Sequence, residues 1–318
     1  MAESIALSQF SKVQHLIVDS RCEGQRLDNF LLRELKGVPK TRLYRAIRKG
    51  EIRVNKGRVK ADYRMVLGDS VRIPPLHLTK RTAPAALPRY WTQELARRII
   101  YEDDNVIAID KPSGLAVHGG SGLSFGLIEG LRQLRPDDRA LELVHRLDRD
   151  TSGVLLLSRR RSVLRELHRQ LRENLMDKRY IALVGGRWPA HVTRVDAPLL
   201  KNVLKSGERM VRVAKEGKRS LTQFSVINRF EGATLIEAKP VTGRTHQIRV
   251  HAKQAGYPIL GDEKYGSDRE HALCAKLGLR RLFLHAQSLR LNLPDVGVIE
   301  LQADLDSELD NTLSNLSK

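Results

Sequence analysis

The chain has 318 residues, 41% of them apolar, which is enough to build one large domain or two of ordinary size. Its longest apolar runs, such as residues 153–157, fall far short of the ~18 residues that a membrane helix needs. Cys22 and Cys274 lie far apart and match neither a disulfide framework nor a metal-ligand set. The first residues show no secretory signal, so we expect a cytoplasmic protein without a membrane partner.

The charge balance indicates a polyanionic partner. Lys and Arg number 56 against 37 Asp and Glu, which gives a net charge of +19. No basic amphipathic helix flanked by Trp or Phe suits a lipid surface, so nucleic acid is the better interpretation. Aromatic residues are only 5% of the chain, which argues against a stacking platform for single strands and favours recognition through phosphates and shape.

Residues 20–80 hold a large share of this charge, with 16 Lys and Arg against 6 Asp and Glu. Apolar residues at helical spacing predict one helix in RLDNFLLREL (26–35) and a second in TRLYRAIRKG (41–50), which Gly50 ends. Short strands are expected around Ile52 and around Val71, with turn residues at 55–57. The second helix carries basic residues largely off its apolar stripe, and these are candidate RNA contacts: Arg42, Arg45, Arg48 and Lys49.

A solvated basic helix in an ordinary adaptor domain is the alternative on charge alone. The segments RLDNFL, VPKTRLYRAIRKGEIRVNKGRVK and GDSVRIP, however, are similar to the RNA-binding domain first described in small-subunit ribosomal protein S4. This resemblance implies a small S4-like RNA-binding domain over residues 20–75.

A second, larger domain is expected over residues 96–310, after a proline-rich, extended linker at 76–95. Strand-like runs lie at 106–110, 154–158, 180–184 and 234–241. Helical patterns lie in SVLRELHRQLREN (162–174), between the second and third runs, and in THQIRVHAKQAG (245–256), after the last one. The chain as a whole is therefore expected to be α+β, with a mixed or antiparallel sheet in the larger domain.

Two stretches of this domain are candidates for chemistry, a glycine-rich loop and a pair of acids. In IDKPSGLAVHGGSG (109–122) the glycines match neither a phosphate loop nor a dinucleotide fingerprint, and we expect a backbone loop that approaches RNA. VHRLDRDTSGVLLLS (144–158) places Asp148 and Asp150 among cations, which would compete with a metal ion for the carboxylates. An Asp beside Arg stays ionised, which suits a nucleophile better than a general acid.

Two further stretches are candidates for substrate contact. In KRYIALV, Tyr180 begins a strand, where a tyrosine is most often part of the core. In VTGRTHQIRVHAKQAG, His246 and His251 are five residues apart without an acidic ligand at a zinc-site offset, which argues against a metal. Arg244 and Arg249 have the same spacing, so one can reach phosphate while the other points into a pocket.

Together and in this order, KPSGLAVH, HRLDRDTSG, KRYIALV and GRTHQIRVH resemble the pseudouridine synthases that modify uridine in ribosomal and transfer RNA. The resemblance implies that Asp148 is the catalytic aspartate, that Arg249 pairs with it and that Tyr180 packs on the uracil ring. It also implies that Arg146 fills or supports the space of the flipped base, while His145 and Thr151 hold the loop. The predicted substrate-binding residues of this domain are Arg146, His145, Lys111, His118, Arg244 and His246.

Pseudouridine formation involves no redox change and no external group, so we expect neither a cofactor nor a metal. The expected substrate is 23S ribosomal RNA of the large subunit, bound by a monomer. A sibling synthase acting on transfer RNA is the alternative among enzymes. A non-catalytic RNA-binding assembly factor is the alternative from another class.

Overall fold

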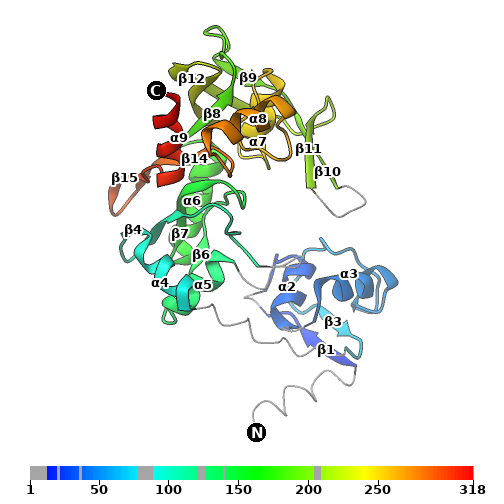
Figure 1. The fold of residues 1–318 in the computed structure, drawn as a ribbon. Coiled ribbons are helices and arrows are strands. Elements are labelled where there is room, and N and C mark those ends of the chain that lie inside the picture. Colours follow the sequence, from blue (N-terminus) through cyan, green and yellow to red (C-terminus); the bar gives the residue numbers. More distant parts are fainter. Residues whose placement is uncertain are drawn as a thin grey trace. The chain divides into compact units, whose positions relative to one another are not determined.

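A computed structural model describes residues 13–19, 22–35, 38–76, 89–119, 126–138, 140–203 and 209–317. The chain divides into two compact units, Met1–Pro84 (unit 1) and Ala85–Lys318 (unit 2) (Figure 1). Within the described ranges, no helix has both the length and the apolar character needed to cross a membrane.

Unit 1 contains the two helices and the small sheet that the sequence predicts. Strand β1 (Gln14–Ile17), before the predicted start of the domain, pairs with β3 (Ser70–Ile73), and β3 also pairs with β2 (Arg53–Val54), all antiparallel. Helix α2 (Leu27–Glu34) and helix α3 (Lys40–Lys49) pack their apolar faces into one core. Gly50 ends α3 with a φ of 69°, a left-handed conformation that glycine adopts without strain.

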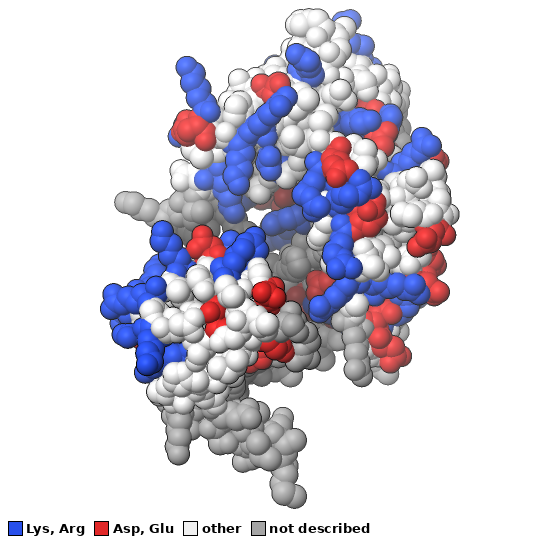
Figure 2. All heavy atoms as spheres, turned by 180° about the vertical axis from the view of Figure 1, so that it is seen from behind, with Lys and Arg blue, Asp and Glu red and all other residues white. Residues whose placement is uncertain are grey.

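The basic face of α3 points away from this core. Arg45, Arg48 and Lys49 are exposed, whereas Arg42 is partly buried and pairs with Glu51 at 2.7 Å. In Figure 2, Lys and Arg atoms gather along the side of unit 1 on which α3 lies. The helix therefore presents to solvent cations that pair with no described carboxylate, as its sequence pattern predicts.

Unit 2 is built on one large mixed sheet, as expected. Its strands run in the order β4 (Ile99–Glu102), β5 (Val106–Lys111), β7 (Ser152–Ser158), β14 (Leu284–Leu293), β8 (Asp177–Gly185), β13 (Ala233–Pro240), β12 (Leu221–Phe230) and β9 (Arg194–Asp196). Strands β6 (Glu142–Leu143) and β15 (Gly297–Gln302) join its β7 and β14. Strands β7 and β14 pair in parallel, whereas the other described pairs are antiparallel. A separate hairpin is formed by β10 (Leu199–Val203) and β11 (Arg209–Val213).

Helices cover both faces of the sheet because its central strands are apolar on both sides. In β5, Ile107 and Ile109 belong to a core shared with α4 (Arg89–Arg97) and α5 (Leu127–Leu134), while Val106 and Ala108 face a core shared with α6 (Arg161–Glu173). The β8–β13 end packs with α7 (Gln247–Gln254), α8 (Asp268–Leu277) and α9 (Ser307–Leu316) (Figure 1). This alternation gives the sheet a separate core on each face.

The prediction of an extended linker through residue 95 is wrong at its end, because α4 begins at Arg89. Leu95 is fully buried in the unit 2 core and Trp91 packs against it, so one helical turn separates two anchoring side chains. The apolar pattern of α4 spans only one helical turn and follows several prolines, so the sequence did not predict this helix. Residues 77–88 of the predicted linker lie outside the described residues.

Candidate active site

Strand pairing brings the predicted site residues together from distant parts of unit 2. Ala286 of β14 pairs with Gly153 of β7 on one side and with Tyr180 of β8 on the other. Tyr180 in turn pairs with Ala238 of β13, and the chain after β13 leads into α7, which carries Arg249. The loop before β7 carries Asp148. These three segments therefore meet at one place on the sheet.

Gly153 is required for this meeting. Its φ is +102°, and a Cβ at this position would lie 2.3 Å from the backbone oxygen of Ala286. Any side chain would push β7 away from β14 directly after the loop that carries Asp148. The glycine of the HRLDRDTSG motif thus permits the close approach of two strands.

A cavity of about 550 Å³ opens where the segments meet. Three walls enclose it: the loop before β7, the chain from the end of β13 into α7, and the connection from α6 to β8. Its lining includes eight predicted or motif residues and several others: His145, Arg146, Asp148, Thr151, Tyr180, Arg244, His246 and Arg249, together with Leu171, Arg172, Asn174, Lys178, Thr242, Gln247 and Leu284. The sequence motifs therefore converge on a single hollow.

Asp148 is the carboxylate of this cavity, with 20% of its side chain exposed. Its Oδ2 lies 3.8 Å from Nη1 of Arg249 and 3.9 Å from Nε2 of His246. Asp150 instead pairs with Arg149 at 3.0 Å, and its backbone oxygen accepts a hydrogen bond from Ser113. The two acids of the motif thus have different surroundings, and only Asp148 lines the cavity.

Arg249 pairs with Asp148 as expected, but its closer partner is Asp262, which we did not predict. Nε and Nη2 of Arg249 donate to the two oxygens of Asp262 at 2.7 and 2.6 Å, and both side chains are almost completely buried. Burial lowers the pKa of Arg249, but the hydrogen bonds and charge of Asp262, together with the charge of Asp148, outweigh it and leave that pKa raised. Arg249 is therefore a fixed cation that is shared between two carboxylates.

His246 is held by Tyr265, the second residue that we did not predict. The Tyr265 hydroxyl accepts a hydrogen bond from the backbone N–H of Val211 at 3.0 Å and lies 2.8 Å from Nδ1 of His246. Burial lowers the pKa of His246, against the charge of Asp148, so the ring is neutral at pH 7. When the hydroxyl donates to Nδ1, Nε2 carries the proton and directs it towards Asp148.

Tyr180 presents a protonated phenol to the cavity. Burial raises its pKa, and the charge of Asp148 adds to the shift. The ring packs against both adjoining apolar cores, which fixes its position beside the acid. Tyr180 thus combines a rigid apolar surface with one polar atom.

His145 holds the loop, as expected, because its Nε2 accepts a hydrogen bond from the backbone N–H of Leu156 at 3.2 Å. Burial, followed by the charge of Lys178, lowers the pKa of His145 to about 4. The ring is therefore neutral at pH 7 and acts as an acceptor that ties the loop to β7. Thr151 is buried, and its backbone N–H donates to the backbone oxygen of Asp148 at 3.3 Å.

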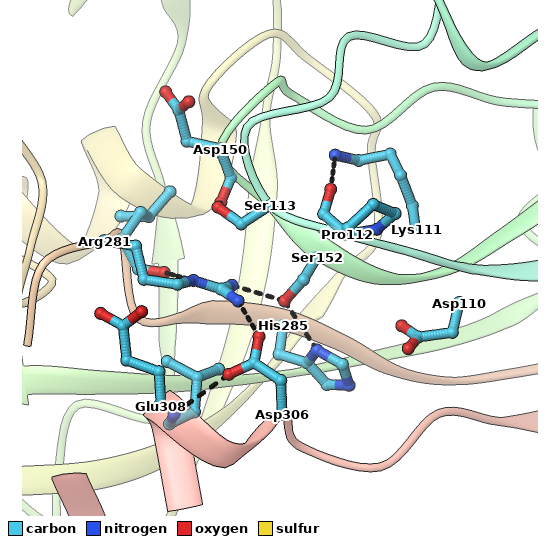
Figure 3. Close-up of polar contacts among 12 residues, drawn as sticks. Asp110, Lys111, Pro112, Ser113, Asp150, Ser152, Arg281, His285, Asp306 and Glu308 are labelled. Atoms are coloured by element: carbon cyan, nitrogen blue, oxygen red, sulfur yellow. Dashed lines mark hydrogen bonds and ion pairs between the residues drawn. The ribbon is translucent and has the colours of Figure 1, made fainter. Parts of the chain in front are cut away.

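The far side of the loop is fixed by a polar network around the buried Ser152 and His285 (Figure 3). Arg281 donates to the Ser152 hydroxyl at 2.5 Å and pairs with Asp306, the N-cap of α9. The same hydroxyl lies 2.8 Å from Nδ1 of His285, whose Nε2 meets the backbone oxygen of Ala303 at 2.9 Å. Ser152 follows the loop directly, so the C-terminal segment helps to hold the loop in place.

The prediction that Lys111 contacts the substrate is not supported. Lys111 is fully buried, and its ammonium donates to the backbone oxygens of Pro112, Leu115 and Arg149 at 2.8–2.9 Å. Three acceptors use all three of its donors. The residue therefore fixes the backbone at Arg149, next to Asp148, rather than meeting RNA.

Some of the other predicted substrate contacts lie at the cavity and others do not. Arg146 and Arg244 are exposed at the cavity, whereas His118 is exposed but is not among the residues that line it. Gly120 and Gly122 of the predicted backbone loop lie outside the described residues. The basic residues of α3 belong to unit 1. In the part of the chain that the structure describes, no three His, Cys, Asp or Glu side chains are grouped as metal ligands would be.

The two missed residues, Asp262 and Tyr265, lie in the segment GDEKYG (261–266), which begins five residues after Gly256. An acid and a tyrosine in a glycine-bounded turn were a weak signal, because such turns are common at surfaces. Asp262 is nevertheless 1% and Tyr265 3% exposed, and Asp262 also accepts the backbone N–H groups of Lys264 and Tyr265. The turn is thus folded under α7, where it supports Arg249 and His246.

Comparison with known families defines the class to which this fold and site belong. Residues 105–254 match the family model described as RNA pseudouridylate synthase, and residues 25–71 match the S4 domain. The chain belongs to the RNA pseudouridylate synthase family, and it is an enzyme of that class with an S4 domain in front.

Individual relatives agree with this assignment. The chain is similar to the protein named ribosomal large subunit pseudouridine synthase C of Escherichia coli strain K12, at 57% identity over 92% of this chain and 93% of the relative. The protein of the same name from Pasteurella multocida is 54% identical over 96% and 94%. Among solved structures, human RNA pseudouridylate synthase domain containing 4 is 28% identical with a TM-score of 0.59, covering 72% of this chain and 96% of that one.

Proposed function

We propose that this enzyme converts specific uridines of 23S ribosomal RNA to pseudouridine, with Asp148 as the reacting carboxylate. The observation that carries the role of Asp148 is its position: it is the acid that lines the 550 Å³ cavity, with Arg249, His246 and Tyr180 around it. The proposed substrate is supported by relatives more than 50% identical over nearly their whole length, which are named for the large ribosomal subunit.

The reaction requires that uridine lose the bond between its ring nitrogen and the sugar, turn, and bond again through ring carbon five. The base must leave the RNA stack to reach Asp148, which is least costly in loops and non-canonical regions. Asp148 then assists cleavage by attacking the sugar or the ring, or by taking a sugar proton. The cavity is about the size of a small-ligand site, so it has room for a flipped uridine.

The neighbouring groups have distinct roles in this proposal. Arg249, fixed by Asp262, stabilises the negative charge of Asp148 and orients it towards the base. Tyr180 packs on the uracil ring and lies near the proton that leaves carbon five. Exposed Arg146 occupies or supports the space that the flipped base vacates. All these steps are isomerisation steps, and none requires a group from outside the RNA and the protein.

Unit 1 supplies affinity rather than chemistry. Arg45, Arg48 and Lys49 are exposed on α3 without ion pairs to described carboxylates, which suits contact with RNA phosphates. The chain acts on RNA in the cytoplasm in this proposal. Its monomeric state stays a prediction, which its mass in solution tests.

The substrate is tested with RNA that carries tritium at carbon five of uridine, because formation of pseudouridine releases that tritium. Wild-type enzyme is incubated separately with 23S ribosomal RNA and with transfer RNA. Release from 23S RNA at a small number of sites is expected. Release from transfer RNA alone would show the sibling activity instead, and binding without any release would show a non-catalytic RNA-binding factor.

A further inference from the structure

The third wall of the cavity carries two cations that the proposed chemistry does not use. Arg172 is exposed in the last turn of α6, and Lys178 is the second residue of β8. Both line the cavity that contains Asp148. This wall, the connection from α6 to β8, is separate from the two that carry Asp148 and Arg249.

The cations closest to them in sequence on the same two elements, Arg169 and Arg179, are paired with carboxylates. On α6, Arg169 pairs with Glu166 at 2.7 Å and also with Glu173. On β8, Arg179 pairs with Asp177 and Glu237, both at 3.0 Å. In contrast, the structure gives neither Arg172 nor Lys178 an ion pair with any described residue. The carboxylates of this region therefore pair with Arg169 and Arg179, and no described carboxylate pairs with Arg172 or Lys178.

Lys178 has the stronger requirement for an anion because it is partly buried. Burial lowers the pKa of Lys178, and no carboxylate opposes the shift. A partly desolvated ammonium without a counter-charge is unfavourable, and an anion in the cavity would relieve that cost. Lys178 lies two residues before Tyr180 in β8, so both side chains are on the same face of the strand, and both line the cavity.

A flipped nucleotide stays joined to the chain through the phosphate on each side of its sugar. When the base enters the cavity, these phosphates must lie at the cavity mouth. We propose that Arg172 and Lys178 bind the phosphates that flank the flipped uridine and so hold the RNA strand while Asp148 acts. This inference rests on the proposed function, because it takes the cavity as the site of the flipped uridine.

Two double variants with the same charge change test the inference in the full-length enzyme. R172Q/K178Q removes the two unpaired cations. R169Q/K239Q removes two cations that are paired, since Lys239 lies 3.0 Å from Asp177. RNA affinity is measured between 50 and 200 mM salt, with the RNA that the wild-type enzyme modifies. A third variant, R172K/K178R, keeps both charges.

On single-stranded RNA each phosphate contact contributes about 0.7 to the slope of log affinity against log salt. R172Q/K178Q is expected to lower that slope by about 1.4, so the advantage of wild type over this variant shrinks about 7-fold between the two salt concentrations. The slope of R169Q/K239Q should change little, and R172K/K178R should match wild type. KM should rise in R172Q/K178Q with kcat nearly unchanged at saturating RNA.

Equal losses of slope in both glutamine variants would overturn the inference, because only net charge would then matter. An unchanged slope in R172Q/K178Q would overturn it as well. Either result is separate from failure of the proposed substrate, which appears as tritium release from the wrong RNA by wild-type enzyme. Thermal unfolding of each variant shows that it is folded at the assay temperature.

Discussion

The pair between Arg249 and Asp262 offers a direct test of how the site is held. Replacing Asp262 by Asn keeps the shape but removes the negative charge from two contacts of 2.6 and 2.7 Å. The side chains are 4% and 0% exposed, so water cannot take the place of the lost carboxylate. Removing one partner of a buried pair costs about 3–5 kcal/mol of stability.

The chain offers a matched control in Arg159 and Asp138. Arg159 also donates from two nitrogens to the two carboxylate oxygens, both at 2.9 Å, but these side chains are 23% and 15% exposed. Because water can solvate a more open pair, Asp138→Asn should cost about 1 kcal/mol. In both pairs Nε and Nη2 of the arginine donate to the two carboxylate oxygens, so the difference in cost mainly measures the effect of burial.

Urea unfolding followed by tryptophan fluorescence measures both variants, since Trp91 and Trp188 both lie in unit 2. Asp262→Asn should also free Arg249 to move onto Asp148, now 3.8 Å away, and lower kcat at least ~10-fold, or ~1.4 kcal/mol of barrier. Equal destabilisation in the two variants, or full activity in Asp262→Asn, would refute the reasoning.

Three further outcomes follow from the site. Gly153→Ala should destabilise unit 2 by ~3 kcal/mol or more, because its Cβ would lie 2.3 Å from the Ala286 oxygen. A Cβ at Gly243 meets open space, so Gly243→Ala should lower the free energy of unfolding by less than ~0.5 kcal/mol. Urea unfolding compares the two variants. Burial lowers the pKa of His145 to about 4. Below pH ~6.5 the unfolded chain therefore binds a proton that the folded chain does not. The free energy of unfolding should fall between pH ~6.5 and pH ~4 by up to ~1.4 kcal/mol per pH unit. His145→Gln should show a smaller loss between pH 6.5 and 5 in the same measurement, and an equal loss would exclude His145 as the cause. Tyr180→Phe should keep the KM for RNA but lower kcat, as measured by tritium release, whereas a change in KM alone would assign Tyr180 to binding.

Local patterns predicted the elements because the side chains that define them are close in sequence. Leu43, Ala46 and Ile47 form the buried face of α3, and Gly50 ends it, as their spacing indicates. The apolar runs likewise became the central strands of the sheet. Helix α4 escaped prediction because its anchors, Trp91 and Leu95, provide one apolar turn after a run of prolines.

The sequence predicted most of the residues of the site, but it did not predict several of the contacts between them. The motifs placed Asp148, Tyr180 and Arg249 in one cavity, but the pairing of Arg249 with Asp262 depends on how the turn at 261–266 folds under α7. Lys111 shows the same limit: a lysine at the end of a strand resembles an exposed contact, yet its ammonium is buried. It donates to two backbone oxygens of the turn that follows it and to the backbone oxygen of the distant Arg149. Tertiary packing decides such contacts, and spacing in the sequence does not encode them.

The role of Asp148 is tested most directly by comparing it with its neighbour in the motif. Asp148→Asn, Asp148→Ala and Asp150→Asn are each incubated with RNA that carries tritium at carbon five of uridine, after their folding has been verified by thermal unfolding. The proposal predicts no tritium release above background for either Asp148 variant, and release near the wild-type level for Asp150→Asn, whose carboxylate pairs with Arg149 outside the cavity lining. Tritium release by Asp148→Ala at a rate close to wild type would contradict it.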